Sequence, residues 1–300
     1  MQNQTPLIFD VKRHALDDGP GIRTVIFFKG CPLRCVWCHN PESIDPMLEI
    51  GFYPSECIHC GSCADVCPND AARMDYPERI DRAICKRCGT CVEACPGHGL
   101  RNIGRFYEVD ELIDIVLRDR IYYQTSGGGV TLSGGEPTLY MDYSSQLLQQ
   151  LKLDNIHTVI ETCGFFNYSE FDTKLLKYLD LILFDIKLAE ADLHREYTGK
   201  SNEVILKNLA MLAGERPEDV IPRIPLVPDI TADRDNLQRI VAILNEMGIK
   251  RCWLLPYNPL GYSKLATIGK PAANLPQRML SKEEMSGIKD IFSGIELVEI

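Results

Sequence analysis

Two short stretches of the chain carry four cysteines each, at the same spacing. The first reads CIHCGSCADVCP and the second CKRCGTCVEACP, so both follow the pattern C-x2-C-x2-C-x3-C-P. The cysteines are Cys57, Cys60, Cys63 and Cys67 in the first stretch, and Cys85, Cys88, Cys91 and Cys95 in the second. So many thiols leave little room for an apolar core, so this part of the chain must fold around something that thiols bind.

The repeated spacing indicates metal. It is the bacterial run that binds a 4Fe–4S cluster, and in two-cluster proteins the fourth cysteine ligates the other cluster. On that pattern one cluster is held by Cys57, Cys60, Cys63 and Cys95, and the second by Cys85, Cys88, Cys91 and Cys67. Two structural zinc sites are the alternative, but they rarely use four cysteines so compressed. We expect residues 50–102 to form a ferredoxin-like insert with two clusters, in a larger domain of residues 1–49 and 103–300.

A third group of cysteines has only three members. The stretch GCPLRCVWCHN places Cys31, Cys35 and Cys38 in the pattern C-x3-C-x2-C. Three thiols can hold three corners of a 4Fe–4S cluster and leave one iron without a protein ligand, and an open metal position is where a substrate or cofactor binds. A zinc loop completed by His39 is the alternative. Cys163 and Cys252 stand alone, and we expect both to be packing residues.

The composition limits the partners and the cellular compartment. The chain has 300 residues and a formal net charge of −10, which argues against a nucleic-acid partner because that needs a basic face. No long apolar run predicts a membrane span. The first residues lack the basic and apolar regions of a secretory signal. Thirteen cysteines in such a chain favour metal over disulfides, and we expect a cytoplasmic protein.

Outside the cysteine-rich part, strands and helices alternate. Runs rich in β-branched and aromatic residues predict strands at 24–30, 129–135, 157–164, 181–188, 220–227 and 251–257. Amphipathic patterns predict helices at 107–123, 141–153, 168–179, 201–214, 233–248 and 281–294. This alternation predicts a parallel sheet with right-handed crossovers, open or curled into a partial barrel. Active sites of such folds lie at the carboxyl ends of the strands, where GCPLRCVWC, SGGEP, ETCG and FDIK fall.

These motifs resemble those of the radical S-adenosylmethionine (SAM) enzymes. The resemblance rests on the three-cysteine loop with an aromatic at Trp37 and on the GGEP of Gly134 to Pro137. More narrowly, DDGPGIRTVIFFKGCPLRCVWCHNPES is similar to the glycyl-radical-enzyme activating enzymes, several of which carry a two-cluster insert. The resemblance runs along essentially the whole chain. We therefore expect an α/β protein, a partial (β/α)6 TIM-like barrel with an inserted bacterial ferredoxin-like domain.

The resemblance also implies which residues hold the cofactors. The amino and carboxylate groups of SAM would bind the iron left open by the three-cysteine loop, which gives three 4Fe–4S clusters in all. The residues implied at the SAM site are Trp37, the backbone around Gly134, Gly135 and Glu136, the pair Asp185 and Lys187, and Arg223. Glu161 and Thr162 match an acidic-Thr pair that helps hold a monovalent cation. This chain has Asn258 as its candidate adenosine-side contact, where the family often has a histidine.

The resemblance implies a protein partner as well. The segment DGPGIR would line the cleft that receives the partner's glycine loop, with Asp18 and Arg23 as contacts beside Gly19, Pro20 and Gly21. The implied reaction cleaves SAM reductively and takes a hydrogen atom from the α-carbon of a glycine in a glycyl radical enzyme. A flavodoxin or ferredoxin-type protein would donate the electron.

Two other classes of function remain open. An iron–sulfur electron carrier would leave the three-cysteine loop without a use. A radical SAM enzyme that acts on a small molecule, or that activates anaerobic ribonucleotide reductase, is disfavoured by DGPGIR and by the insert.

Overall fold

The computed structural model describes residues 5–299. Its centre is a nine-stranded sheet in the order β11-β10-β9-β8-β7-β6-β2-β1-β5. Six neighbouring strands run parallel, namely β2 (Arg23–Phe28), β6 (Gly129–Gly134), β7 (His157–Thr162), β8 (Leu181–Asp185), β9 (Val220–Leu226) and β10 (Arg251–Pro256). At one edge, β1 (Leu7–Ala15) and β5 (Arg105–Phe106) continue the sheet in antiparallel pairs. At the other edge, β11 (Glu296–Leu297) pairs in parallel with β10.

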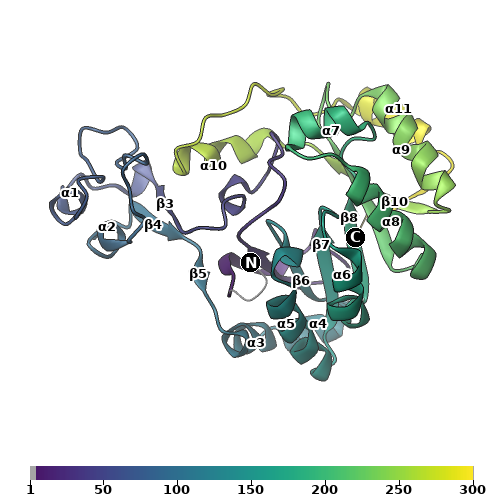
Figure 1. Ribbon diagram of the computed structural model, residues 1–300, viewed down its shortest axis with the longest axis horizontal. Helices are drawn as coiled ribbons and strands as arrows, with labels where there is room; N and C mark the ends of the chain where they lie inside the picture. The colour runs from purple at the N-terminus through teal and green to yellow at the C-terminus, as the bar shows by residue number, and fades with distance from the viewer. Residues whose placement is uncertain (1–4, 300) are drawn as a thin grey trace.

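Helices follow the strands and cover the sheet (Figure 1). They are α3 (Val109–Leu117), α4 (Arg120–Ser126), α5 (Met141–Leu153), α6 (Tyr168–Lys174), α7 (Ala191–Thr198), α8 (Glu203–Glu215), α9 (Arg234–Glu246), α10 (Tyr262–Thr267) and α11 (Lys282–Ile291). One face of the sheet contributes Ile160 and Ile182 to the main core. The opposite face packs Val159 and Leu183 against Trp253. The strands are therefore buried on both faces, as is typical of parallel sheets.

The cysteine-rich segment projects from the edge of the main body (Figure 1). It begins with β3 (Glu49–Phe52), ends with the antiparallel β4 (Leu100–Ile103), and contains the one-turn helices α1 (Ser62–Asp65) and α2 (Thr90–Glu93). A buried ion pair between Lys29 Nζ and Glu49 Oε2, 3.0 Å apart, fixes its first strand to the end of β2. Arg82 donates to the carbonyl of Thr267 at 3.2 Å, which ties the segment to the end of α10.

The parallel strands are confirmed by the structure, and two of the predicted helices differ. The helix predicted at 107–123 is divided into α3 and α4 at Asp119, whose buried carboxylate accepts hydrogen bonds from Arg13 (2.7 Å) and Thr24 (3.0 Å). The helix predicted at 168–179 ends at Lys174 and continues as a 3-10 turn at Leu176–Tyr178. The sequence patterns did not predict β1, α7 or α10. Among the described residues, no helix is both long and apolar enough to cross a membrane.

Candidate functional site

The three-cysteine loop begins at the carboxyl end of β2. Backbone hydrogen bonds fix it to two other segments, residues 43–44 and residues 197–198. Gly30, at φ +100°, turns the chain out of the strand. The amides of residues 30 and 31 donate to the carbonyls of residues 43 and 44 at 2.6 and 3.2 Å. The amides of residues 34 and 36 donate to the carbonyls of residues 198 and 197 at 2.7 and 3.1 Å. The end of α7, which the sequence did not predict, therefore supports the loop.

A cavity of about 100 Å³ brings the three predicted ligands together. Its lining includes Cys31, Cys35 and Cys38. Burial raises the pKa of Cys38 to about 12 and also raises that of Cys35, so both thiols stay neutral until a metal replaces their protons. Three thiols around one small cavity fit the donor set of an iron–sulfur cluster with one open corner.

A fourth thiol lines the same cavity. Cys163 follows β7 and is buried, as expected of a packing residue. Burial raises its pKa well above the ordinary value, and the adjacent Cys31 thiol raises it further. Its proximity to Cys31 was not predicted because nothing in the spacing of a lone cysteine indicates which loop it will meet.

The glycine-rich turn after β6 packs directly against this loop. A Cβ on Gly134 (φ +106°) would lie 2.4 Å from the amide of Phe28, and one on Gly135 would lie 2.1 Å from the carbonyl of Gly30. Only glycine allows this approach. The amides of Gly135 and Glu136 donate to the carbonyls of Phe28 and Gly30 at 2.8 and 2.7 Å. These two amides therefore hold the loop, and any backbone contact with the amino group of SAM must use carbonyls.

The Glu136 carboxylate serves the fold. It is fully buried and accepts hydrogen bonds from the hydroxyl of Thr138 (2.7 Å), the hydroxyl of Thr162 (2.9 Å) and the amide of Cys163 (2.7 Å). It thereby ties the end of β6 to the end of β7. Thr162 is buried as well, and its hydroxyl oxygen also accepts from the amide of Gly164 at 3.0 Å. Both residues were predicted near the cofactor, and the structure uses their side chains to align the strand ends.

Four charged side chains meet where β7 and β8 end beside the middle of β9. Arg223 donates to Asp185 (2.8 Å) and to Glu161, Lys187 donates to Asp185 (2.8 Å), and Ser133 donates to Glu161 (2.5 Å). Burial raises the pKa of Glu161. Burial alone would also raise the pKa of Asp185, but Arg223 and Lys187 outweigh it and lower that pKa. Two acidic and two basic side chains are therefore paired with one another beside the thiol-lined cavity.

A second cavity, of about 500 Å³, adjoins the first. Both are lined by Cys35, Cys38, Ser133, Gly134, Glu161, Asp185, Lys187 and Arg223. Its volume is typical of a small-molecule site. Trp37 and Tyr257 line its apolar side and belong to the same buried cluster. The structure therefore brings most of the predicted SAM residues around one space.

Three residues of this region differ from expectation. Asn258 lines a third cavity, of about 820 Å³, whereas Tyr257 lines the 500 Å³ cavity. His39, considered only as a zinc ligand, lines both cavities, and burial lowers its pKa. Ser133 was missed, although it stands directly before the predicted Gly134 and Gly135.

The thiols of the insert lie in two sets drawn from both cysteine runs. A small cavity is lined by Cys67 of the first run together with Cys85, Cys88 and Cys91 of the second. Cys63 in turn lies near Cys57 and Cys95, whose charges raise its pKa together with the larger effect of burial. This grouping matches crossed ligation, in which each fourth cysteine serves the other cluster.

The surroundings of the two insert sets are alike in their hydroxyl groups and differ at the fourth cysteine of the first run. The Cys67 sulfur accepts hydrogen bonds from the amides of Ala71 and Ala72 at 3.2 and 3.4 Å. Hydroxyl groups lie near one exposed thiol of each run, Ser62 at 3.3 Å from Cys60 and Thr90 at 3.4 Å from Cys88. Within residues 5–299, no three His, Cys, Asp or Glu side chains surround a single point as ligands of one metal ion do. A four-iron cluster instead spreads its thiolates over separate irons.

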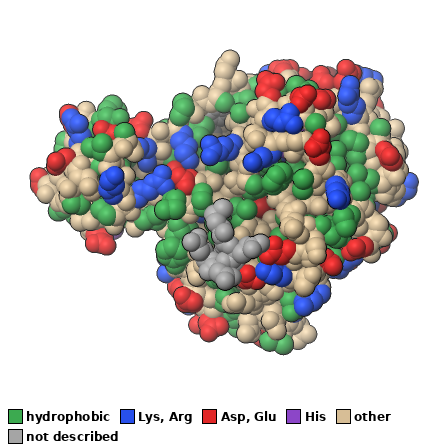
Figure 2. All heavy atoms as spheres, viewed as in Figure 1, with side chains coloured by type: hydrophobic (Ala, Val, Ile, Leu, Met, Phe, Trp, Pro, Cys, Tyr) green, Lys and Arg blue, Asp and Glu red, His purple; other side chains and the backbone are tan. Residues whose placement is uncertain are grey.

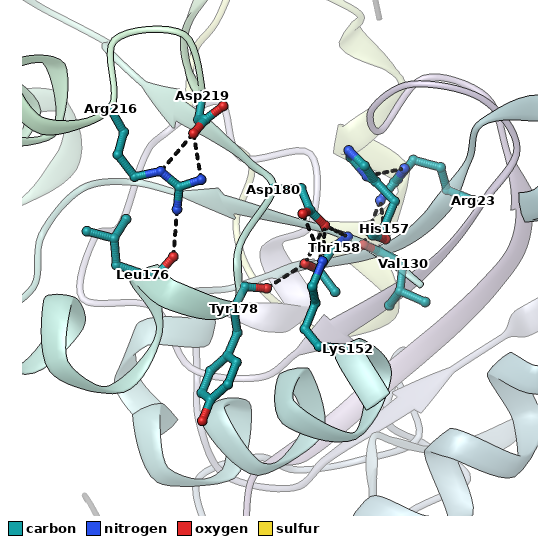
Figure 3. A network of polar contacts seen from close by, with 10 residues as sticks. All are labelled: Arg23, Val130, Lys152, His157, Thr158, Leu176, Tyr178, Asp180, Arg216 and Asp219. Carbon is teal, nitrogen blue, oxygen red and sulfur yellow. Dashed lines mark hydrogen bonds and ion pairs between the residues drawn. The ribbon is translucent and has the colours of Figure 1, made fainter. Parts of the chain in front are cut away.

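The DGPGIR segment reaches the site through Asp18 but not through Arg23. Asp18 lines both the 500 and the 820 Å³ cavities. The Arg23 side chain is 0% exposed and donates to Thr131 (2.6 Å), to the carbonyl of Val130 (2.7 Å) and to the carbonyl of Pro20 (3.0 Å). Figure 3 shows it beside Val130 and His157. The expectation that Arg23 contacts a partner is wrong for this structure, because the guanidinium is enclosed and anchors the segment instead.

Comparisons with known proteins identify the family of this chain. The family model of the radical SAM superfamily matches residues 25–241. The trans-4-hydroxy-L-proline dehydratase activating enzyme of Clostridioides difficile is 38% identical over 293 residues, covering 96% of each chain. The benzylsuccinate synthase activating enzyme of Thauera aromatica is 41% identical over 273 residues, covering 88% of this chain and 82% of its own.

A third relative and one solved structure complete the comparison. The choline trimethylamine-lyase activating enzyme of Oleidesulfovibrio alaskensis is 38% identical over 277 residues, covering 90% of this chain and 89% of its own. The crystal structure of Streptococcus suis SuiB bound to the precursor peptide SuiA matches with a TM-score of 0.53 at 14% identity, over 91% of this chain and 48% of that one. That likeness shows the fold alone.

Proposed function

This chain belongs to the radical SAM superfamily and, within it, to the glycyl-radical-enzyme activating enzymes, and from that premise we propose which residues carry each part of the activity. A 4Fe–4S cluster of such an enzyme supplies the electron that cleaves SAM, so that the resulting radical takes a hydrogen atom from a glycine of the partner enzyme. The side chains of the site would bind SAM, orient it and exclude water.

Cys31, Cys35 and Cys38 are the proposed ligands of the catalytic cluster. The observation that carries this assignment is their common cavity, which adjoins the 500 Å³ cavity. The thiol-lined cavity would hold the cluster, and the adjoining cavity is large enough for SAM. Burial raises the pKa of the Cys35 and Cys38 thiols, so these two would release protons on loading and cluster assembly would be linked to pH.

The four charged residues would hold the methionine part of SAM. Lys187 and Arg223 are cations at the wall of the cavity and suit the carboxylate of SAM, whereas Asp185 and Glu161 suit its ammonium and sulfonium charges. Carbonyl oxygens of Gly134 and Gly135 are the backbone acceptors for the amino group. Trp37 offers an apolar wall for the adenosyl part. Glu161 and Thr162 are the proposed neighbours of a monovalent cation, since they end β7 at the same cavity.

The insert, residues 50–102, is proposed to be a ferredoxin-like domain that brings the chain to three 4Fe–4S clusters. The thiol grouping around Cys67 supports crossed ligation. The main domain, residues 1–49 and 103–300, is proposed to be a partial (β/α)6 barrel. We propose a flavodoxin or ferredoxin-type protein as the electron donor, with the insert as its point of entry. The partner would be a glycyl radical lyase or dehydratase, the class named for the relatives.

Anaerobic reconstitution tests this assignment. Three clusters predict about twelve irons and twelve sulfides per chain, with 5′-deoxyadenosine released when a reductant and SAM are added. About eight irons without SAM cleavage would instead indicate an electron carrier. SAM cleavage at twelve irons, but without a glycyl radical on any glycyl radical enzyme, would favour a small-molecule substrate.

A further inference from the structure

The 820 Å³ cavity lies where the insert meets the main domain, and we name it the outer groove. It shares the lining residues Asp18, His39 and Asn40 with the 500 Å³ cavity proposed to bind SAM. The two cavities therefore adjoin at these three residues. A segment that approaches SAM along the outer groove must pass these three residues.

Three parts of the chain form the walls of the outer groove. The main sheet contributes Phe9, Asp10, Lys12 and Phe27, the region of α10 contributes Asn258, Gly261 and Lys264, and the insert contributes Tyr53, Arg101, Asn102 and Ile103. Figure 2 shows Lys and Arg side chains, in blue, gathered over the junction between the insert and the main body. This junction is locally basic, although the whole chain has a net charge of −10.

Two buried carboxylate oxygens at the groove accept no hydrogen bond from the described residues. They are Asp18 Oδ2 and Glu42 Oε2. Asp18 Oδ2 lies 3.7 Å from Lys12 Nζ, beyond hydrogen-bond distance, and the other oxygen of Glu42 pairs with Lys264 at 3.3 Å. Buried acceptors nearly always find a donor. The backbone N–H groups of an extended peptide are donors of this kind.

We propose that the insert docks the glycine-bearing segment of the partner in the outer groove, through Tyr53 and Arg101. The proposal rests on the proposed function and extends it, because the insert would then recognise the partner in addition to carrying electrons. The segment lies extended, with its N–H groups facing Asp18 and Glu42. Glycine passes the junction at His39 and Asn40 because it has no side chain.

The chain offers a matched control for Arg101. The Arg101 side chain is 44% exposed, pairs with Glu56 and stacks 4.4 Å from the ring of Tyr53. Arg105 is 58% exposed, pairs with Glu111 and stacks 3.7 Å from the ring of Tyr107. Only the first of these two arginines lines the outer groove. Replacement of either arginine by glutamate therefore removes an ion pair and a ring contact of the same kind. Only the replacement of Arg101 also changes the charge that lines the outer groove.

The test uses the reconstituted protein and, as candidate partners, glycyl radical lyases and dehydratases, the class named for the relatives. Glycyl radical is measured by electron paramagnetic resonance against partner concentration. For Arg101→Glu we expect the half-saturating partner concentration to rise about tenfold, and for Arg105→Glu less than about twofold. Release of 5′-deoxyadenosine without partner stays unchanged in both variants. Equal effects of the two variants on partner affinity would overturn the proposal.

A second arm does not depend on charge reversal. The photo-crosslinker p-benzoylphenylalanine replaces Tyr53 in one protein and Tyr107 in another, both partly buried rings beside an arginine. We expect the first to link to the glycine-bearing segment of the partner and the second not to link. If the crosslinker at position 53 does not link to the partner while the wild type still forms the glycyl radical, the docking proposal is overturned and the proposed function stands. If wild type cleaves SAM but leaves no radical on the partner, the proposed function fails as well.

Discussion

The main domain and the insert are stabilised in different ways. The main core is built from apolar side chains of nearly every strand and helix around the sheet. The insert has a core of only Ile50, Phe52, Ala72, Ile80, Cys91 and Leu100, and the partly buried apolar residues packed against it are Val92 and its own cysteines. The main domain can fold by burying apolar surface, whereas the insert depends on what its thiols bind.

The same contrast holds for the two kinds of cysteine site. Among the insert thiols, Cys60 and Cys88 are exposed and Cys91 is buried, whereas all three cysteines of the loop are partly buried. The three-cysteine loop instead borders a cavity whose other walls are ion pairs and strand ends. On the proposed assignment, the insert would hold its clusters near the outside, where electrons would enter. The three-cysteine loop would hold a cluster with one open iron at the inner cavity, where SAM would be shielded from water.

The largest expected effect is on SAM cleavage, and it distinguishes the three-cysteine loop from the insert. Cys35→Ala should abolish SAM cleavage and lower the iron content from about twelve to about eight per chain. Cys91→Ala should lower iron similarly, yet leave SAM cleavage intact when a strong chemical reductant supplies the electron. Iron analysis and 5′-deoxyadenosine release check both variants. Equal loss of cleavage in both would contradict this separation, because cleavage would then require an intact insert even with a chemical reductant.

Removal of iron should unfold the insert and leave the main domain folded. Without metal, the few apolar residues of the insert cannot offset the entropy of ordering its loops. Limited proteolysis of the chelated protein should therefore cut within residues 57–95 and leave the sheet protected. Protection of the insert in chelated protein would contradict this difference in stabilisation.

Breaking the ion pairs of the site should destabilise the main domain even in iron-free protein. Arg223→Met leaves two buried carboxylates without their shared partner and should cost about 3–5 kcal/mol of unfolding free energy. Arg216→Met is the control: Arg216 donates to Asp219 and to the carbonyl of Leu176 (Figure 3), its side chain is 28% exposed against 10% for Arg223, and its replacement should cost clearly less. Urea unfolding followed by circular dichroism measures both. An equal loss of unfolding free energy in the two variants would show that the buried ion pairs of Arg223 stabilise the main domain no more than a pair nearer the surface.

The smallest effect concerns the fourth thiol. Cys163→Ser should leave the iron content at about twelve per chain, because Cys163 borders the catalytic cavity without being a ligand. Cys31→Ser should lose about four irons by comparison. If Cys163→Ser also loses four irons, the catalytic cluster has four protein ligands, and the contrast between open and closed sites disappears.

The sequence predicted what depends on spacing and periodicity. The cysteine patterns and the alternating strands and helices were sufficient for the sheet, for the three thiol groups and for the rim motifs. Contacts between distant segments were less accessible. Nothing in the polar pattern of α7 indicated that its end supports the cysteine loop. Arg23 was misassigned because charged side chains are usually exposed, whereas here three hydrogen bonds to oxygen acceptors compensate for its burial.

The most direct test of the account asks whether SAM binds the iron left open by Cys31, Cys35 and Cys38. Electron–nuclear double resonance on the reduced protein, with SAM carrying ¹⁵N in its amino group, detects such a bond as a hyperfine coupling to the cluster. The account predicts this coupling in wild type and in a variant whose insert cysteines are replaced. Absence of the coupling while SAM is bound and cleaved would contradict it, because the cluster would then have no open iron.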